Sequence, residues 1–351
     1  MAHTKHPATC PGAHCNHINH TNDRRRNYIM PLLDMPLHEL RQYQGRNPRP
    51  ANIDAFWDAS VAEMEALGTD CELVKADFQV PHSTCYDLFY TGVKGARIHA
   101  KLVVPDADKP LPAVVNFHGY TGRAPDFVDL LKWTAAGFVI AALDCRGQAG
   151  ESEDVGGVKG NTHQGHIIRG LAENDPEKLL FRDIFLDAAQ LARIVMALPQ
   201  VDETKVGAFG GSHGGALTLA CAALTPKLNR CAPTYPFLCD YQRVWEMDLA
   251  KDAYQELRDY FRRYDPLHAH EKEIFTLLGY IDNQHIAHRI QAKTLMFTGL
   301  MDNICPPSSQ FAAYNKITSE KDVVIYPDFG HEYLPFAAEK AMQFMLEMAN
   351  A

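Results

Sequence analysis

Residues 206–215 read Val-Gly-Ala-Phe-Gly-Gly-Ser-His-Gly-Gly, and the helix-forming run Ala216-Leu217-Thr218-Leu219-Ala220 follows them. A short apolar run that ends in glycines predicts a strand, then a sharp turn and a helix, with Ser212 at the apex. Glycines on both sides of the turn let the strand and the helix approach closely. The spacing Gly210-x-Ser212-x-Gly214 is that of a nucleophile elbow, which holds a serine hydroxyl above the edge of a sheet.

An acid and a histidine follow the serine, each in a loop after a predicted strand. Asp302 follows one of these strands, and His331 follows the last strand. Parallel strands bring such loops to one edge of the sheet, where α/β proteins place their ligands. The order Ser212, Asp302, His331 is that of the α/β-hydrolases and differs from the orders in chymotrypsin and subtilisin. We therefore predict a catalytic triad, with Asp328, three residues before the histidine, as the less favoured acid.

Two backbone N–H groups are predicted to form an oxyanion hole. One belongs to His213, at the start of the helix, where amide donors are unpaired and the helix dipole favours negative charge. The other belongs to Tyr120, in the loop Asn116-Phe117-His118-Gly119-Tyr120-Thr121-Gly122 after an early strand, with Gly119 as the second candidate. His118 precedes the serine and lies at a strand end, so we expect it to be structural.

The body of the chain alternates strands with helices. We expect strands at 71–80, 85–91, 97–104, 113–117, 138–143, 205–209, 231–235, 294–298 and 323–326, and helices at 37–45, 52–67, 127–136, 179–198 and 335–348. Near-continuous apolar strands that alternate with helices predict an α/β fold, with a mostly parallel central sheet covered by helices on both faces. The first three strands are expected to form an antiparallel edge. Two stretches, 146–177 and 239–290, interrupt the alternation, and such insertions commonly carry lids, substrate contacts or subunit contacts.

Composition narrows the class of protein further. The net charge of −9 argues against nucleic acid or an anionic membrane as the main partner. The chain has no run of about 18 or more apolar residues, so we expect no transmembrane helix. The nine cysteines are an odd number, and most lie in apolar runs. We expect them to be small buried hydrophobes in a reduced cytoplasm rather than a disulfide framework.

The first 29 residues differ from the rest of the chain. They are rich in histidine and basic residues and lack the apolar region of a secretory signal. Cys10, Cys15, His17 and His20 can be drawn as a zinc site, but their spacing is not that of a standard zinc finger. We therefore expect a disordered extension over 1–29, no metal site, and a single domain over 30–351.

Five groups of residues together resemble one known family. They are His118-Gly119-Tyr120, Arg146-Gly147-Gln148, Gly210-Gly211-Ser212-x-Gly214-Gly215, Asp302 before Cys305-Pro306-Pro307, and His331-Glu332. From about Met30 to its end, the chain resembles the acetyl xylan esterase / cephalosporin C deacetylase family, the seventh carbohydrate esterase family.

The resemblance implies an α/β-hydrolase that removes small acyl groups, mainly acetyl, and needs no cofactor. The implied substrates are acetylated sugars, short xylo-oligosaccharides and cephalosporin C. The resemblance assigns Ser212, Asp302 and His331 to the triad, and Tyr120 and His213 to the oxyanion hole. It also implies a homo-hexamer with narrow entrances, to which the 146–177 insertion would contribute contacts.

The resemblance gives further side chains roles around the triad. Tyr235 and Phe237, after a strand, are expected to line the acyl pocket, where Tyr120 also contacts substrate. Arg146 and Gln148 are expected to brace the loops around the catalytic histidine. Glu332 is the expected partner of the arginine.

This sequence departs from the family pattern beside the nucleophile. The family has glutamine there, and this chain has His213. Because the oxyanion contact uses the backbone N–H, we expect catalysis to survive the difference. The side chain could alter the pocket or its response to pH.

Two other classes of protein remain as alternatives. A peptidase of the prolyl oligopeptidase type shares the triad order, but the roughly 80 residues before the catalytic core leave no room for its β-propeller. A binding protein on an inactive hydrolase scaffold is disfavoured by the intact triad.

Overall fold

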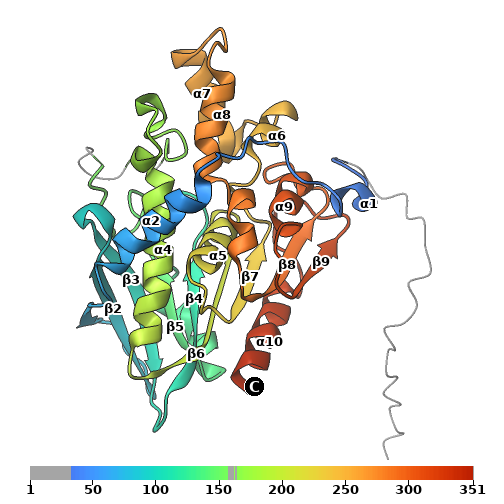
Figure 1. The fold of residues 1–351 in the computed structure, drawn as a ribbon. Coiled ribbons are helices and arrows are strands. Elements are labelled where there is room, and N and C mark those ends of the chain that lie inside the picture. The colour runs from blue at the N-terminus through green and yellow to red at the C-terminus, as the bar shows by residue number, and fades with distance from the viewer. Residues whose placement is uncertain (1–32, 157–161, 163, 351) are drawn as a thin grey trace, which may run out of the picture. The chain divides into compact units, whose positions relative to one another are not determined.

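The structure is a computed structural model that describes residues 33–156, 162 and 164–350. Within these residues a nine-stranded sheet runs in the order β1-β2-β3-β5-β4-β6-β7-β8-β9 (Figure 1). The strands are β1 (Glu72–Lys75), β2 (Ser83–Thr91), β3 (Arg97–Pro105), β4 (Leu111–Phe117), β5 (Val139–Leu143), β6 (Val201–Gly211), β7 (Arg230–Thr234), β8 (Lys293–Gly299) and β9 (Lys321–Tyr326). β1, β2, β3 and β5 pair antiparallel, and β5, β4, β6, β7, β8 and β9 pair parallel. The mostly parallel sheet and its antiparallel edge confirm the predicted architecture.

The central strands are apolar throughout because both of their faces are covered. Along β4, Ala113, Val115 and Phe117 belong to the core on one face, and Val114 belongs to the core on the other face. Side chains of a strand point alternately to the two faces, so a strand buried on both sides has no polar face. This explains why the apolar runs in the sequence predicted these strands well.

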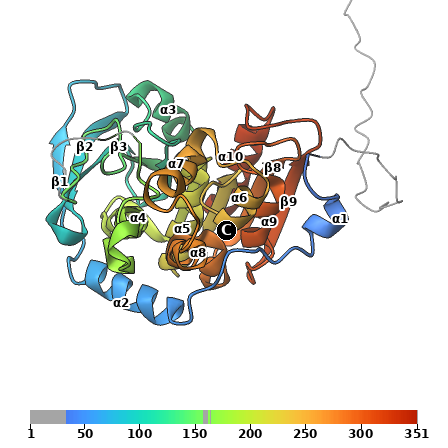
Figure 2. The ribbon, with the colours of Figure 1, turned by 90° about the horizontal axis from the view of Figure 1, so that it is seen from above.

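Helices cover both faces of the sheet. They are α1 (Leu37–Leu40), α2 (Ile53–Glu65), α3 (Phe127–Ala135), α4 (Leu180–Ala197), α5 (His213–Leu224), α6 (Tyr241–Glu246), α7 (Gln255–Tyr264), α8 (Glu271–Leu278), α9 (Pro307–Tyr314) and α10 (Ala337–Asn350). The core that contains α2, α4 and α5 lies on one face, and the core that contains α3 and α10 lies on the other. Figure 2 shows α2 and α4 on the side opposite α3.

The two insertions have different structures. The described parts of 146–177 hold only short 3-10 turns, at Leu171–Glu173 and at the start of Pro176–Lys178. The insertion at 239–290 is mostly helical and contains α6, α7 and α8 together with further 3-10 turns. These three helices gather at one end of the sheet in Figure 1. The second insertion therefore supplies a helical cover rather than a loop.

Two helices differ from the sequence prediction. α1 ends at Leu40 and not at the predicted residue 45, because hydrogen bonds to Asp240 hold the following segment in a non-helical conformation. The Asp240 carboxylate accepts hydrogen bonds from the Tyr43 hydroxyl and from the backbone N–H groups of Arg46 and Asn47. α9 was not predicted. Its serines and glutamine are as buried as its phenylalanine, so it has no polar face to give a helical pattern.

The described cysteines are all unpaired, and six of the seven are buried. This agrees with their expected role as small apolar side chains. Cys10 and Cys15, the zinc-like pattern and the expected extension over 1–29 lie outside the described residues. No helix in the described parts of the chain is long and apolar enough to cross a membrane.

Candidate active site

The predicted elbow lies between β6 and α5. Ser212 has φ 58° and ψ −118°, a sparsely populated conformation that costs of order 1–3 kcal/mol. Its N–H donates to the carbonyl of Thr234 at 3.0 Å. A Cβ on Gly214 would lie 2.0 Å from the carbonyl oxygen of Phe117, and one on Gly210 would lie 2.6 Å from the carbonyl oxygen of Gly214. Both glycines are therefore needed for this close packing of helix and strands.

The three predicted triad residues form one continuous line of hydrogen bonds. His331 Nε2 lies 2.9 Å from Ser212 Oγ, and His331 Nδ1 lies 2.8 Å from Asp302 Oδ2. Asp302 is completely buried. Its Oδ1 accepts hydrogen bonds from the backbone N–H groups of Ile304 at 2.9 Å and Cys305 at 2.8 Å. These bonds aim the carboxylate at Nδ1–H, which leaves Nε2 free to accept the serine proton.

The geometry distinguishes the two candidate acids. Asp328 is exposed, whereas Asp302 contacts His331. Gln310, on the unpredicted helix α9, lies behind the acid and was missed. Its Nε2 donates to the carbonyl of Cys305 at 2.6 Å and lies 3.5 Å from Asp302 Oδ2. The glutamine holds the loop that carries the acid, and no pattern in the sequence pointed to it.

The predicted oxyanion donors are available for a ligand. Among the described residues, neither the N–H of Tyr120 nor the N–H of His213 has a hydrogen-bond acceptor. His213 is the first residue of α5, directly after Ser212, so its N–H lies at the positive end of that helix dipole. Two unpaired amide donors beside a serine can stabilise the negative oxygen of a tetrahedral intermediate.

The side chain of His213 joins the two halves of this oxyanion hole. It is completely buried, and its Nδ1 lies 3.1 Å from the carbonyl oxygen of His118. Because a carbonyl only accepts, Nδ1 carries the proton. The unprotonated Nε2 then accepts from the Gln148 amide at 3.3 Å. Rings of Tyr120 and Phe181 pack against the imidazole with centroids 5.6 Å away. Burial lowers the pKa of His213 well below its usual value, so the ring stays neutral.

His118 holds the loop from the other side, which supports its expected structural role. Its Nδ1 donates to the carbonyl of Gly119 at 2.7 Å, and its Nε2 accepts from the N–H of Cys145 at 3.1 Å. Burial lowers the pKa of His118 as well. The imidazole thus ties the loop that precedes Tyr120 to the end of β5.

The two predicted pocket aromatics lie on different parts of the site. The ring of Tyr235 packs against His331, with centroids 4.5 Å apart. Phe237 is completely buried and packs against the ring of Tyr120, with centroids 5.6 Å apart. The first aromatic therefore contacts the catalytic histidine, and the second supports the oxyanion loop.

The predicted partner of Arg146 was wrong. The guanidinium makes two hydrogen bonds to Asp187 on α4, Nε to Oδ2 at 2.6 Å and Nη2 to Oδ1 at 2.7 Å, and both side chains are buried. This bidentate pair raises the pKa of the arginine. The arginine thus anchors the start of the first insertion to α4. It does not pair with Glu332.

Glu332 and Gln148, the other two residues predicted to brace the site, support different loops. Glu332 accepts a hydrogen bond from the N–H of Gly330 at 3.0 Å, so it braces the histidine loop from within. Gln148 contacts His213 rather than the loop around His331. Its predicted site was wrong because the loop after β5 lies beside β4 in the sheet, next to the elbow, and not beside β9.

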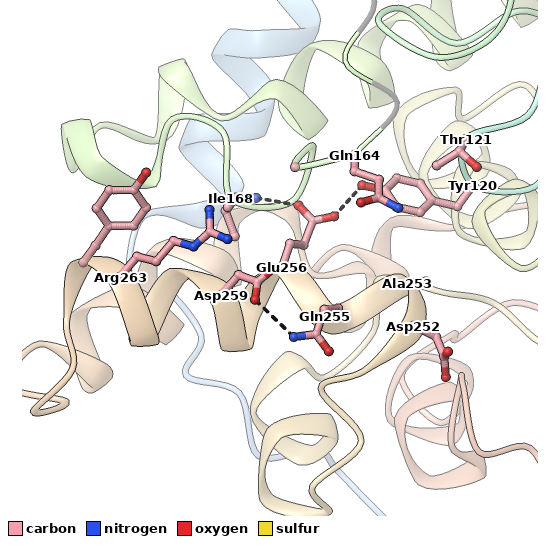
Figure 3. Close-up of a pocket in the computed structure, with 12 residues that line it drawn as sticks. Tyr120, Thr121, Gln164, Ile168, Asp252, Ala253, Gln255, Glu256, Asp259 and Arg263 are labelled. Carbon is pink, nitrogen blue, oxygen red and sulfur yellow. Dashed lines mark hydrogen bonds between the residues drawn. The ribbon is translucent and has the colours of Figure 1, made fainter.

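Glu256 on α7 is a further residue that sequence reasoning missed. Its Oε1 accepts a hydrogen bond from the Tyr120 hydroxyl at 2.5 Å, and its Oε2 accepts from the N–H of Ile168 at 3.2 Å (Figure 3). Oε2 also accepts from the N–H of Ile167 at 2.7 Å. Burial raises the pKa of Glu256. One carboxylate therefore joins both insertions to the oxyanion loop. A glutamate on the same buried helix face as Leu257 was the signal available in the sequence.

Within the described residues, two groups of side chains have the residue types of a metal site. They are His118, Cys145 and His213, and Asp302, Cys305 and His331. In the first group both rings use their nitrogens in the hydrogen bonds given above. In the second, the aspartate and the histidine bond to each other. A metal ion would have to displace these bonds in either place.

The comparison with known families decides where this site belongs. A family model described as acetyl xylan esterase (AXE1) matches residues 30–348. The chain belongs to the acetyl xylan esterase family. This membership, with the serine elbow, makes it a hydrolytic serine esterase with the α/β-hydrolase fold.

Solved structures from the same family are similar over most of the chain. Acetyl xylan esterase 1 from Thermoanaerobacterium sp. JW/SL YS485 is 54% identical with a TM-score of 0.87, and the match covers 90% of this chain and 99% of that one. Acetyl xylan esterase from Paenibacillus sp. R4 is 34% identical with a TM-score of 0.83, and covers 89% and 99%.

A curated relative is more distant. Acetyl esterase Axe7A of Xylanibacter ruminicola is 25% identical over 297 residues, which are 82% of this chain. The chain spans 64% of the length of that relative.

We expect substitution of His213 by glutamine to change how stability depends on pH. A histidine that is buried neutral has a folded-state pKa below its unfolded-state pKa of about 6.5. Below that value the unfolded state binds more protons than the folded state. The contribution of the buried histidine to folding stability is therefore fully present above about pH 6.5 and is lost as the pH falls. Relative to H213Q, the wild type should therefore lose stability by up to about 1.4 kcal/mol for each pH unit.

Urea unfolding of both proteins between pH 7 and pH 5 measures this difference. Other groups with shifted pKa values, such as Asp282, are common to both proteins and cancel in the comparison. Parallel curves of unfolding free energy against pH would show that the histidine is not buried in its neutral form.

Proposed function

We propose that the chain is a serine carboxylesterase that removes acetyl groups from acetylated xylo-oligosaccharides, other small acetylated sugars and cephalosporin C. The observation that carries this proposal is the line of hydrogen bonds from Ser212 through His331 to Asp302. Family membership supports the acetyl group as the acyl part. The reaction proceeds through an acyl-enzyme on the serine.

Acylation uses the polar groups of the site in turn. Ser212 Oγ attacks the carbonyl carbon of the ester while His331 Nε2 takes its proton. The oxygen of the tetrahedral intermediate accepts hydrogen bonds from the N–H groups of Tyr120 and His213. The carbon–oxygen bond to the sugar then breaks, and the histidine gives its proton to the departing oxygen. The products are a free sugar hydroxyl and an acetylated serine.

Deacylation repeats these steps with water as the nucleophile. His331 takes a proton from water, and the hydroxide adds to the acetyl carbonyl in the same oxyanion hole. When the intermediate collapses, Ser212 leaves with the proton from the histidine and acetate is released. Throughout, Asp302 holds Nδ1–H and stabilises the imidazolium.

We expect a strong preference for short acyl chains. Aromatic rings lie beside the catalytic groups, because Tyr235 packs on His331 and Phe237 is buried behind Tyr120. A pocket closed by such rings rejects added methylene groups. The ratio kcat/KM for p-nitrophenyl esters should fall by about tenfold or more from acetyl to octanoyl. Equal values along the series would contradict a small acyl pocket.

A panel of natural-type substrates tests the proposed activity. Acetylated xylo-oligosaccharides and cephalosporin C are incubated with enzyme, and released acetate is measured, with the S212A variant as the control. We expect acetate from the wild type only. A proline-containing peptide in the same panel tests the peptidase alternative, and its cleavage without release of acetate would overturn the proposal.

The assembly and location of the protein belong to the same proposal. We propose a homo-hexamer on the strength of the family resemblance, and a cytoplasmic location on the strength of the unpaired, mostly buried cysteines among the described residues. Light scattering coupled to size-exclusion chromatography measures the mass of the assembly. A monomer at assay concentration would contradict the hexamer.

A further inference from the structure

A cavity lies beside the oxyanion loop and is lined by residues of both insertions. Its volume is about 450 Å³, and its lining includes Tyr120, Thr121, Gly165, Ile168 and one face of α7 (Figure 3). This volume is within the range of small-molecule sites, roughly 300–1,000 Å³. The cavity shares Tyr120 with the catalytic site, so the two are adjacent.

α7 presents a regular polar face to this cavity. Gln255, Asp259 and Arg263 are four residues apart and all line it, because residues at this spacing lie on one side of a helix. The opposite side of the helix is buried through Leu257 and Phe261. The polar side chains are therefore directed into the cavity by the same packing that holds the helix in place.

Much of the hydrogen-bonding capacity of this face is unused. The side chains of Asp252 and Arg263 are exposed, and in the parts of the chain that the structure describes no hydrogen bond or ion pair joins them to another residue. Asp259 accepts one bond, from Gln255 Nε2 at 3.2 Å through Oδ1, and its other oxygen has no partner there. The cavity thus offers acceptors and a five-donor guanidinium within one helix length.

Aromatic side chains stand at both ends of the polar face. Tyr120 lies at the end next to the catalytic site, and Tyr264, which is 69% exposed, lies at the outer end of α7. An aromatic ring supplies an apolar surface beside the polar groups. A ligand with both hydroxyl groups and apolar C–H faces matches this combination.

We propose that this cavity binds the sugar part of the ester substrate, an assignment that rests on the proposed esterase function. Sugar hydroxyls both donate and accept, so they can pair with carboxylates and guanidinium alike. An extended acyl chain or a lipid would leave these charged groups without partners, at a cost in binding. The lining therefore selects a neutral polyhydroxylated molecule.

The position of Tyr120 indicates how the ester would be oriented between the triad and the cavity. Its N–H is a predicted oxyanion donor, and its hydroxyl bonds to Glu256, which also lines the cavity. An ester whose carbonyl oxygen reaches that N–H has its alcohol part next to the same residue. We therefore infer that the acetyl group enters the triad side while the sugar lies along α7.

Substitutions on α7 test this assignment. R263Q and D259N remove a charge from the cavity while keeping the approximate size of the side chain, and R262Q is the matched control on the adjacent residue, which does not line the cavity. We expect KM for acetylated xylotriose to rise by about tenfold in R263Q or D259N, which is the usual effect of losing a hydrogen bond to a charged group. The kinetics of p-nitrophenyl acetate, which has no sugar, should stay within about twofold.

A second readout uses the sugar without its ester. Deacetylated xylotriose should inhibit p-nitrophenyl acetate hydrolysis competitively in the wild type and in R262Q, and much less in R263Q. Unchanged KM and inhibition in the cavity variants, with p-nitrophenyl acetate still hydrolysed, would overturn this assignment and leave the esterase function intact. Equal losses on both substrates would show that the variants act through the oxyanion loop, and would also overturn it.

Discussion

Substitution of Ser212 by alanine lowers kcat for p-nitrophenyl acetate by about a million-fold, which is the usual loss when a serine nucleophile is removed. The hydroxyl is the only group that His331 Nε2 contacts at 2.9 Å in the described site, and alanine leaves the imidazole without a nucleophile. The oxyanion donors remain, so a weak residual activity of about 10³–10⁴ over water is expected. Steady-state hydrolysis at saturating ester measures the loss.

The control for this variant is its fold. Circular dichroism and thermal unfolding should match the wild type, because the glycines on either side of the turn already allow the elbow and the new side chain is smaller. Near-wild-type turnover in a folded S212A protein would contradict the assignment of the nucleophile.

Substitution of Asp302 by asparagine should lower kcat by about 10⁴-fold. The side chain keeps its shape, and its oxygen can still accept from the N–H groups of Ile304 and Cys305. The amide nitrogen then faces His331 Nδ1 and favours the tautomer in which Nε2 carries the proton. That tautomer cannot accept the proton of the serine.

Asp328→Asn is the matched control for this prediction. It makes the same chemical change on the exposed acid three residues before His331. We expect its kcat to stay within about twofold of the wild type. If D328N lost activity and D302N kept it, the two acids would have to exchange roles.

The triad could be predicted from the sequence because each member follows a strand. Apolar strands are the clearest signals in this chain, since β4 and its neighbours are buried on both faces. Once the strands are placed, parallel pairing brings the loops that carry Ser212, Asp302 and His331 to one edge of the sheet. The order of serine, aspartate and histidine along the chain then identified the triad as that of an α/β-hydrolase.

The side chains around the triad could not be predicted in the same way. Arg146 pairs with Asp187, one of two acidic residues on α4 that the sequence does not distinguish. Glu256 lies in an insertion, where no strand order indicates which loop it meets. The contact of His213 with the carbonyl of His118 depends on a close approach of two loops that only the folded structure shows.

Labelling with a fluorophosphonate tests the central claim most directly, because this reagent reacts only with a serine that is activated as a nucleophile. The folded enzyme is treated with the probe, digested, and mapped by mass spectrometry. We predict a single modification, on the peptide that contains Ser212, and its disappearance in H331A. No modification of the folded protein, or modification at another serine, would contradict the account.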